Sequence, residues 1–181
     1  MAETPLFGEL IPDGCTPKWV ELSITPKGVY VLNLKAVADP ENRWTTPFTQ
    51  AVQRAFEALE QDLQQHIDRP AALLTVSESP KFFSNGIDPD GRHSKKLGLA
   101  APSELDTLEG HLLAMPAFIR PLQLPIPTVA AVGGHAFGAG MMFALGHDYR
   151  LQATGRGFMC AIELEIGVGI PDPELELFRH A

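Results

Sequence analysis

A glycine-rich segment at the start of a helix could bind a negatively charged oxygen. Residues 138–140 read Gly-Ala-Gly, follow a short apolar run at 128–132, and open a helix that is apolar on every side through Leu145. Their small side chains let another molecule approach the free N–H groups of the first helical turn, where the helix dipole is positive. Because a helix without a polar face must be enclosed by the fold, we predict an oxyanion-binding site in the protein interior.

The same glycines have a simpler explanation, which the sequence leaves open: close packing of a strand against a helix. Two nucleotide-binding motifs are excluded. The G-x-G-x-x-G fingerprint requires a different spacing from that of Gly134, Gly138 and Gly140, and the phosphate-binding loop requires a lysine that this stretch lacks. The apolar run is also far shorter than the roughly 18 residues of a membrane span.

A second donor could come from residues 82–88, Phe-Phe-Ser-Asn-Gly-Ile-Asp. This segment follows a predicted buried strand, which is where open α/β sheets place ligands. Asn85-Gly86 permits a positive φ, and such a turn would direct the N–H of Ile87 away from strand pairing. An oxyanion hole usually needs two converging N–H groups. Asn-Gly pairs also occur in ordinary turns, so that alternative stays open.

Apolar periodicity predicts the elements that position these two segments. Residues 19–24 and 29–34 alternate around a Pro-Lys-Gly turn and predict a β-hairpin. An amphipathic stripe that runs to Ile67 predicts a helix capped by Thr46 and ended by Pro70. Further expected elements are a strand buried on both faces at 71–76, a helix at 104–122, and short strands at 149–153 and 158–166. This order predicts an α/β layered fold with mostly buried strands.

Composition bounds the class of protein. The 181 residues suffice for one domain, and we predict an irregular segment at 1–18 followed by a core domain at 19–181. The chain has 14 basic and 22 acidic residues, a net charge of −8, which argues against nucleic acid and anionic membranes as partners because both favour a basic face.

The termini and cysteines bear on location. The N-terminus lacks the basic and apolar regions of a secretion signal, and no C-terminal address signal is present. Cys15 and Cys160 are isolated, which suits a reducing compartment. We expect an intracellular protein, in the cytoplasm first of all, with peroxisome and mitochondrion left open.

Three motifs in order resemble the enoyl-CoA hydratase/isomerase (crotonase) superfamily. They are Phe-Phe-Ser-Asn-Gly-Ile-Asp at 82–88, Pro-Thr-Val-Ala-Ala-Val-Gly-Gly-His-Ala-Phe-Gly-Ala-Gly at 127–140, and His-Asp-Tyr-Arg at 147–150. The hairpin and the loop Glu-Asn-Arg-Trp-Thr-Thr-Pro at 41–47 also resemble the N-terminal part of the family, particularly its isomerase branch. The resemblance covers residues 19–171 approximately.

The resemblance implies a fold, a substrate and an assembly. The fold is the ClpP/crotonase spiral of repeated β-β-α units, the substrates are acyl-CoA thioesters, and the assembly is a homotrimer or hexamer. No cofactor is expected, because coenzyme A is part of the substrate. The resemblance places the two N–H groups that bind the enolate oxygen at Ile87 and Ala139, in agreement with the backbone argument. The substrate-binding residues it implies are Ser84, Asn85, Gly86, Ile87, Asp88, Gly138 and Ala139.

The acid–base residue is also implied by the resemblance. Hydratases of the family carry one glutamate where this chain has Met142, and a second glutamate after the following short strand. Counting forward from the start of that region and counting back from its end give positions for this glutamate that differ by one residue. A one-residue insertion reconciles the two counts and selects Glu163, with Glu165 as the fallback. Both glutamates could instead alternate with apolar neighbours on a half-solvated strand.

Chemistry favours isomerisation over hydration. Hydration calls for two groups, whereas moving a double bond from the β–γ to the α–β position needs one base, and Met142 cannot titrate. Apolar neighbours would raise the pKa of Glu163 toward the working pH, as a general base requires. We therefore expect an enoyl-CoA isomerase of fatty acid metabolism, acting in β-oxidation. Two alternatives remain: an enoyl-CoA hydratase or other crotonase-type enzyme, and, because the chain stops at Ala181 before the further helices of the family, a truncated non-catalytic CoA-binding or assembly protein.

The remaining polar residues suggest structural roles. His135 and His147 flank the apolar helix without metal-type spacing, so we expect hydrogen bonding and no metal. Cations that could contact the CoA phosphates are Lys35, Lys81, Arg92, Lys95 and Lys96.

Overall fold

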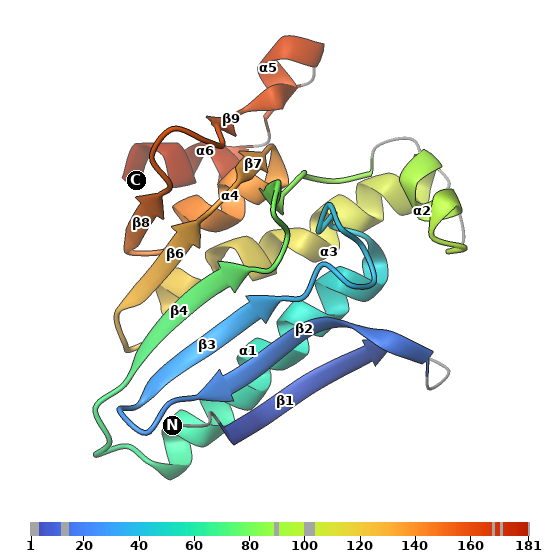
Figure 1. Ribbon diagram of the computed structural model, residues 1–181. Coiled ribbons are helices and arrows are strands. Elements are labelled where there is room, and N and C mark those ends of the chain that lie inside the picture. The colour runs from blue at the N-terminus through green and yellow to red at the C-terminus, as the bar shows by residue number, and fades with distance from the viewer. Residues whose placement is uncertain are drawn as a thin grey trace.

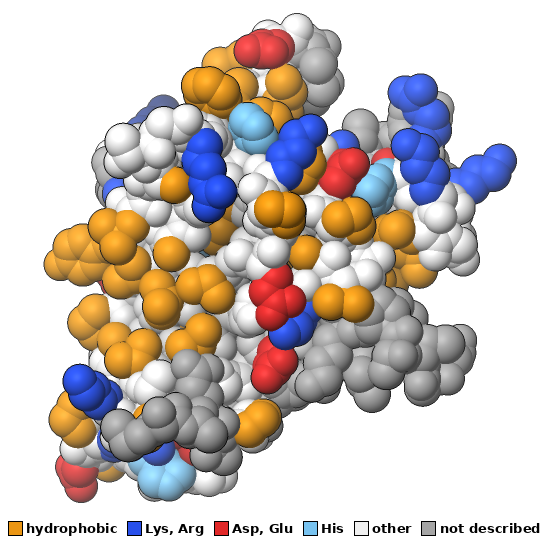
Figure 2. Space-filling view, viewed as in Figure 1, with side chains coloured by type: hydrophobic (Ala, Val, Ile, Leu, Met, Phe, Trp, Pro, Cys, Tyr) orange, Lys and Arg blue, Asp and Glu red, His pale blue; other side chains and the backbone are white. Residues whose placement is uncertain are grey.

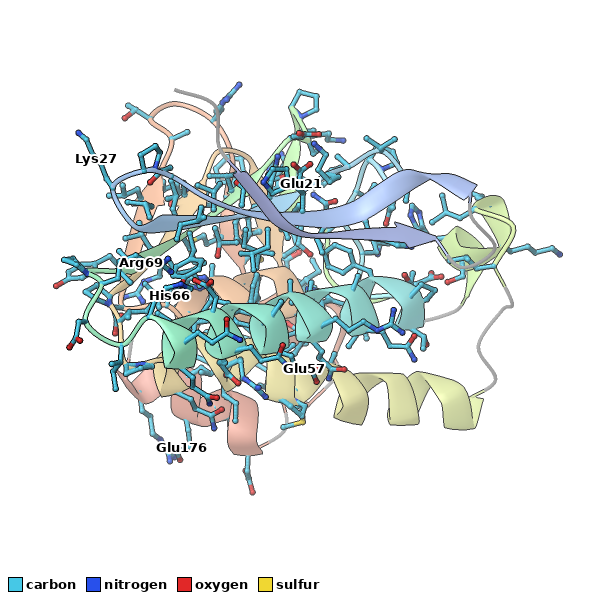
Figure 3. All side chains as sticks on the ribbon, turned by 90° about the horizontal axis from the view of Figure 1, so that it is seen from below. Glu21, Lys27, Glu57, His66, Arg69 and Glu176 are labelled. Atoms are coloured by element: carbon cyan, nitrogen blue, oxygen red, sulfur yellow. The ribbon has the colours of Figure 1, made fainter. Side chains whose placement is uncertain are left out.

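A twisted sheet with helices packed on one face makes up most of the protein (Figure 1). The computed structural model describes residues 4–11, 15–88, 91–99, 104–167, 169–170 and 172–180. Viewed from below, helix α1 (Thr46–Gln65) lies between the sheet and helix α3 (Glu104–Gln123), so the molecule is layered (Figure 3). The α/β fold class predicted from the sequence is confirmed.

The larger sheet has six strands in the order β1-β2-β3-β4-β6-β8. Strands β1, β2 and β3 pair antiparallel, and the predicted hairpin of β2 and β3 is confirmed, with Gly28 at φ +83° in its turn. From β3 onward the neighbours are parallel. The strand bounds are β1 Thr4–Ile11, β2 Cys15–Ile24, β3 Val29–Leu34, β4 Ala72–Ser77, β6 Thr128–Val132 and β8 Tyr149–Gln152.

A smaller parallel sheet, in the order β5-β7-β9, lies beyond the ends of the larger one. Its strands are β5 Phe82–Ser84, β7 His135–Phe137 and β9 Met159–Cys160. Each repeat sends its first strand (β4, β6 or β8) to the larger sheet and its second strand to the smaller one, and a helix follows. These are the repeated β-β-α units expected from the resemblance.

The remaining helices complete these repeats. Helix α2 spans Arg92–Lys96 and precedes α3 in the first unit, α4 spans Ala139–Leu145, α5 spans Ile162–Ile166, and α6 spans Asp172–His180. Helix α4 is the predicted apolar helix. Six of its seven residues are buried, which confirms that the fold encloses it. Gly146 caps its C-terminus with an ordinary right-handed φ of −66°, and the position requires glycine because a Cβ there would lie 1.9 Å from Phe118 O.

An aromatic cluster at the centre of the core holds the loop between β3 and α1. The ring of Trp44 meets those of Phe48, Phe118 and Phe143 edge to face, with centroids 4.8–5.1 Å apart. Trp44 is 5% exposed. Its burial ties residues 39–44 to the elements that surround the candidate site.

Several sequence expectations need correction. Residues 4–11 and 15–18 of the segment predicted as irregular belong to strands β1 and β2, and the rest of residues 1–18 lies outside the described residues. The strand predicted at 158–166 is only two residues long, because Ala161 caps helix α5 and residues 162–166 are helical. The second strands β5 and β7 were missed, since three residues are too few for a visible alternation.

Burial also differs from expectation in three places. Strand β4 is buried on one face only, through Leu73 and Thr75. Strand β8 lies at the sheet edge and is largely exposed, so the expectation of buried strands fails there. Helix α1 is capped by Thr45 rather than Thr46 and ends at Gln65, which leaves Ile67 85% exposed and outside the apolar stripe.

Candidate functional site

The two backbone segments singled out in the sequence lie against each other. A Cβ atom at Gly86 would lie 2.8 Å from Phe137 O and 3.7 Å from Ala139 N. Gly86 also has φ +76°, a conformation that other residues rarely adopt. Glycine is therefore required where the loop after β5 meets the start of α4. A Cβ at Gly140 would lie 2.4 Å from Ser84 O, so the first turn of α4 also packs closely against the end of β5.

The direction of the Ile87 N–H follows from the preceding peptide. Trp44 N–H donates to Gly86 O at 2.9 Å, as part of an isolated parallel bridge between Trp44 and Ile87. Because no cis peptide occurs among the described residues, the carbonyl of Gly86 and the N–H of Ile87 point in opposite directions. The Ile87 N–H therefore points away from Trp44, outside this pairing.

The side chains of the loop after β5 are occupied by the protein itself. Ser84 Oγ donates to Asn42 O at 2.7 Å, and Asn85 Nδ2 donates to Glu41 Oε2 at 2.7 Å. The buried carboxylate of Asp88 accepts from the N–H groups of His93 and Ser94, at 3.1 and 2.6 Å. Because these three side chains are engaged within the protein, a ligand would contact this loop through its backbone groups.

Glu163 lies beside the glycine that begins helix α4. It sits on α5 and is 7% exposed, and a Cβ at Gly138 would lie 2.6 Å from its Oε1. The absence of a Cβ at Gly138, which adopts φ +50° and ψ −122°, leaves room for that carboxylate. The structure thus brings Glu163 to the segment that carries the Ala139 N–H.

Glu165 faces elsewhere. Successive helical residues are about 100° apart, so two residues separated by two positions lie on nearly opposite faces. Glu165 is exposed, and its Oε1 accepts a weak hydrogen bond from Cys160 Sγ at 3.8 Å. The alternative in which both glutamates alternate on a strand is wrong, because residues 162–166 form a helix.

The histidines flanking α4 make structural contacts. His147 Nδ1 lies 2.9 Å from Phe143 O and its Nε2 lies 2.8 Å from Thr75 Oγ1. A neutral ring satisfies both if Nδ1–H donates to the carbonyl and Nε2 accepts from the hydroxyl. Burial lowers the pKa of His147 to about 4. His135 packs on Phe137 and Phe158. Across the residues that are described, no group of three or more His, Cys, Asp or Glu could hold a metal ion.

The cations considered for CoA phosphates fall into two groups. Lys35 is engaged by Glu78 and Glu21, and Lys81 lies over the ring of Phe82 at 4.9 Å. The other three share helix α2, where Figure 2 shows basic side chains gathered at the upper right; they are Arg92, Lys95 and Lys96. Helix α2 is tied to the loop after β5 that carries the Ile87 N–H (residues 85–88, the donor loop), because Asp88 accepts hydrogen bonds from the N–H groups of His93 and Ser94.

A polar network between residues 39–43 and the donor loop was not predicted from the sequence. Arg43 Nη1 donates to Ile87 O at 2.6 Å, and Arg43 Nε donates to Glu41 Oε2 at 2.7 Å. His93 Nε2 lies 2.7 Å from Asp39 Oδ1. The only signal in the sequence was the motif at 41–47, which carries a resemblance but does not reveal these long-range contacts.

Comparison with known proteins identifies the family that the chain resembles over most of its length. Residues 25–175 match the family model described as enoyl-CoA hydratase/isomerase. Among curated proteins of Arabidopsis thaliana, enoyl-CoA delta isomerase 2, peroxisomal, is 35% identical over 101 residues, which cover 56% of this chain and 41% of that protein. Enoyl-CoA delta isomerase 1, peroxisomal, is 33% identical over 138 residues (76% and 52%). A probable enoyl-CoA hydratase 2, mitochondrial, is 30% identical over 145 residues (78% and 44%).

Solved structures agree on the fold. An enoyl-CoA hydratase/carnithine racemase from Magnetospirillum magneticum superposes with a TM-score of 0.70 at 22% identity, covering 91% of this chain and 57% of that one. The chain therefore spans about half the length of the relatives it matches. In the part of the chain that is described, no helix is long and apolar enough to cross a membrane.

Proposed function

The chain belongs to the enoyl-CoA hydratase/isomerase family, and we propose that it is an isomerase that moves the double bond of a fatty acyl-CoA from the 3 to the 2 position. The observation that carries this proposal is the contact between Glu163 and Gly138, where a Cβ would lie 2.6 Å from the carboxylate oxygen. It sets one buried carboxylate beside one of the two candidate N–H donors. The two delta isomerases among the relatives support the same activity.

The proposed mechanism uses two backbone donors and one base. The thioester carbonyl accepts hydrogen bonds from the N–H groups of Ile87 and Ala139. Glu163 removes a proton from the α carbon, and the electron pair of that C–H bond moves into an enolate whose oxygen the donors stabilise. The same proton returns to the γ carbon as the double bond shifts to the α–β position, so no other reactant is needed. Losing one such donor costs about 3–4 kcal/mol of transition-state stabilisation.

The choice between isomerisation and hydration rests on Met142. This residue is fully buried within α4 and stands where the hydratases of the family carry their first glutamate. A thioether cannot direct a water molecule by taking its proton, so one carboxylate must suffice. Hydration is the second candidate, because one relative is a probable hydratase.

Two variants of helix α5 test the assignment of the base. Purified protein is assayed with a 3-enoyl-CoA, and the conjugated product is followed by its absorbance. We expect Glu163→Gln to lower kcat by on the order of 100-fold or more, as loss of a general base typically does. The matched control, Glu165→Gln, removes the same charge from an exposed face of the same helix and should leave kcat unchanged.

Three results would count against the proposal. Undiminished activity in Glu163→Gln removes this residue from the mechanism. Hydration of a 2-enoyl-CoA without isomerisation of the 3-enoyl isomer supports the second candidate. Binding of acyl-CoA without turnover of either substrate identifies a non-catalytic member of the family.

We also propose that the protein forms a homotrimer or hexamer. Apolar side chains that are exposed in the single chain support this assembly, namely Tyr149, Leu151, Phe158 and Leu164, each more than 60% exposed. Figure 2 shows hydrophobic side chains collected over the left part of the sheet, where β6 and β8 lie. Native mass spectrometry measures the stoichiometry directly, and a monomer at micromolar concentration would refute the assembly.

A further inference from the structure

Arg43 connects the loop before α1 to the donor loop after β5. Its Nη1 donates to Ile87 O at 2.6 Å, its Nε donates to Glu41 Oε2 at 2.7 Å, and its own N–H donates to Asp39 Oδ2 at 2.7 Å. The guanidinium is thus held by an acidic partner while it binds a backbone carbonyl. Its planar set of donors suits two simultaneous hydrogen bonds in fixed directions.

Glu41 ties the same arginine to the donor loop from the other side. Its Oε2 accepts from Asn85 Nδ2 at 2.7 Å as well as from Arg43, and its backbone oxygen accepts from Asn85 N–H at 2.9 Å. Burial favours the neutral acid, but the hydrogen bonds from Asn85 and Arg43 outweigh it, so the pKa of Glu41 is lowered. The carboxylate is therefore charged at neutral pH and holds Arg43 and Asn85 together.

These contacts fix the peptides on both sides of Ile87. The peptide before it is held by the hydrogen bond from Trp44 N–H to Gly86 O at 2.9 Å. The peptide after it is held by Arg43 at Ile87 O. With both flanking planes fixed, the φ and ψ angles of Ile87 are fixed, and so is the direction of its N–H.

We propose that Arg43 is a positioning residue for the oxyanion donor of Ile87, which rests on the function proposed above. Arg43 does not touch the substrate and acts only through the peptide of Ile87. Its ion pair with Glu41 is 22% and 31% exposed, and ion pairs of this kind add little stability. Misplacing a reacting group by about 1 Å, in contrast, lowers a rate on the order of 100-fold.

Two arginine variants separate positioning from stability. In Arg43→Met the stem remains but both side-chain hydrogen bonds are lost. The matched control is Arg150→Met, because Arg150 Nη1 also donates to backbone carbonyls, at His147 O (2.6 Å) and Leu145 O (3.5 Å). These lie at the C-terminal end of α4, opposite the end that begins at Gly138. Relative to this control, we expect kcat of Arg43→Met for a 3-enoyl-CoA to fall by about 10- to 100-fold. KM should change less than about threefold, because the N–H donors act more strongly on the enolate than on the thioester.

A spectroscopic measurement follows the donor itself. With ¹⁵N-isoleucine labelling, the Ile87 amide resonance should move and its order parameter should fall in Arg43→Met but not in Arg150→Met. Added guanidinium ion at millimolar concentration should restore part of the lost kcat in the smaller variant Arg43→Ala, since it can occupy the vacated position between Glu41 and Ile87.

The outcomes distinguish this inference from the proposed function. If the unmodified protein neither isomerises the substrate nor shifts its Ile87 amide when acyl-CoA is added, the proposed function is wrong, and the role of Arg43 in it falls too. If the unmodified protein is active while Arg43→Met keeps the kcat and the Ile87 resonance of the control, the positioning role alone is refuted.

Discussion

Replacing Gly138 with alanine should lower both stability and activity, and the loss of activity should be specific to this glycine. A Cβ at this position would lie 2.6 Å from Glu163 Oε1 and 3.2 Å from Ile162 Cγ2, where ordinary contacts begin at 3.4 Å. The carboxylate oxygen is the end of a flexible side chain, so it can retreat by about 0.8 Å at little cost in folding free energy. Since a misplacement of about 1 Å lowers a rate on the order of 100-fold, we expect a loss of that size in kcat.

The effect of Gly138→Ala on stability comes mainly from the backbone. Its φ of +50° with ψ −122° is unfavourable for alanine, and such strain costs about 1–3 kcal/mol. Gly155 is a matched control, because it has φ +77° and nothing within 4 Å of a Cβ, so that Gly155→Ala carries backbone strain without a steric contact.

The assay pairs two measurements on both variants. Urea unfolding gives the free energy of unfolding, and conversion of a 3-enoyl-CoA to the conjugated isomer gives kcat. Similar losses of stability with a selective loss of kcat in Gly138→Ala support the reasoning. If the two variants have equal kcat, displacing the carboxylate beside Gly138 does not affect the reaction, and the reasoning is refuted.

Two further predictions concern stability. Because burial holds the pKa of His147 at about 4 in the folded protein and its ordinary value is 6.5, the unfolded chain binds the proton first as pH falls. The free energy of unfolding should therefore drop by up to about 3 kcal/mol between pH 6.5 and about pH 4. His147→Gln should flatten this part of the pH profile measured by urea unfolding, and an unchanged slope would be the contrary result. Gly146→Ala places a Cβ 1.9 Å from the backbone oxygen of Phe118 and must push α3 away from α4, which should lower the free energy of unfolding by about 1–3 kcal/mol or more. Gly133→Ala is the control, because a Cβ there has nothing within 4 Å. Equal thermal midpoints of the two variants would contradict the packing argument.

Local patterns in the sequence determined the hairpin, helix α1, the apolar helix α4 and the need for glycine around residues 86 and 138. These features depend on periodicity of two or 3.6 residues and on positive φ, which neighbouring residues decide. The resemblance to the family predicted the crotonase spiral and selected Glu163. Strands β5 and β7 were not predicted and β9 was predicted too long, because strands of three residues or fewer carry too little pattern and pair only with parallel partners from other parts of the chain.

Tertiary structure alone decided which side chains meet. The turn of α5 buries Glu163 and exposes Glu165, a difference that the sequence of two glutamates two positions apart does not reveal. Arg43 reaches Ile87 across 44 positions, and Gly86 meets Ala139 across more than fifty, because β-β-α repeats return the chain to the same sheet edge. Contacts at such separation depend on strand order and helix packing, which no local pattern contains.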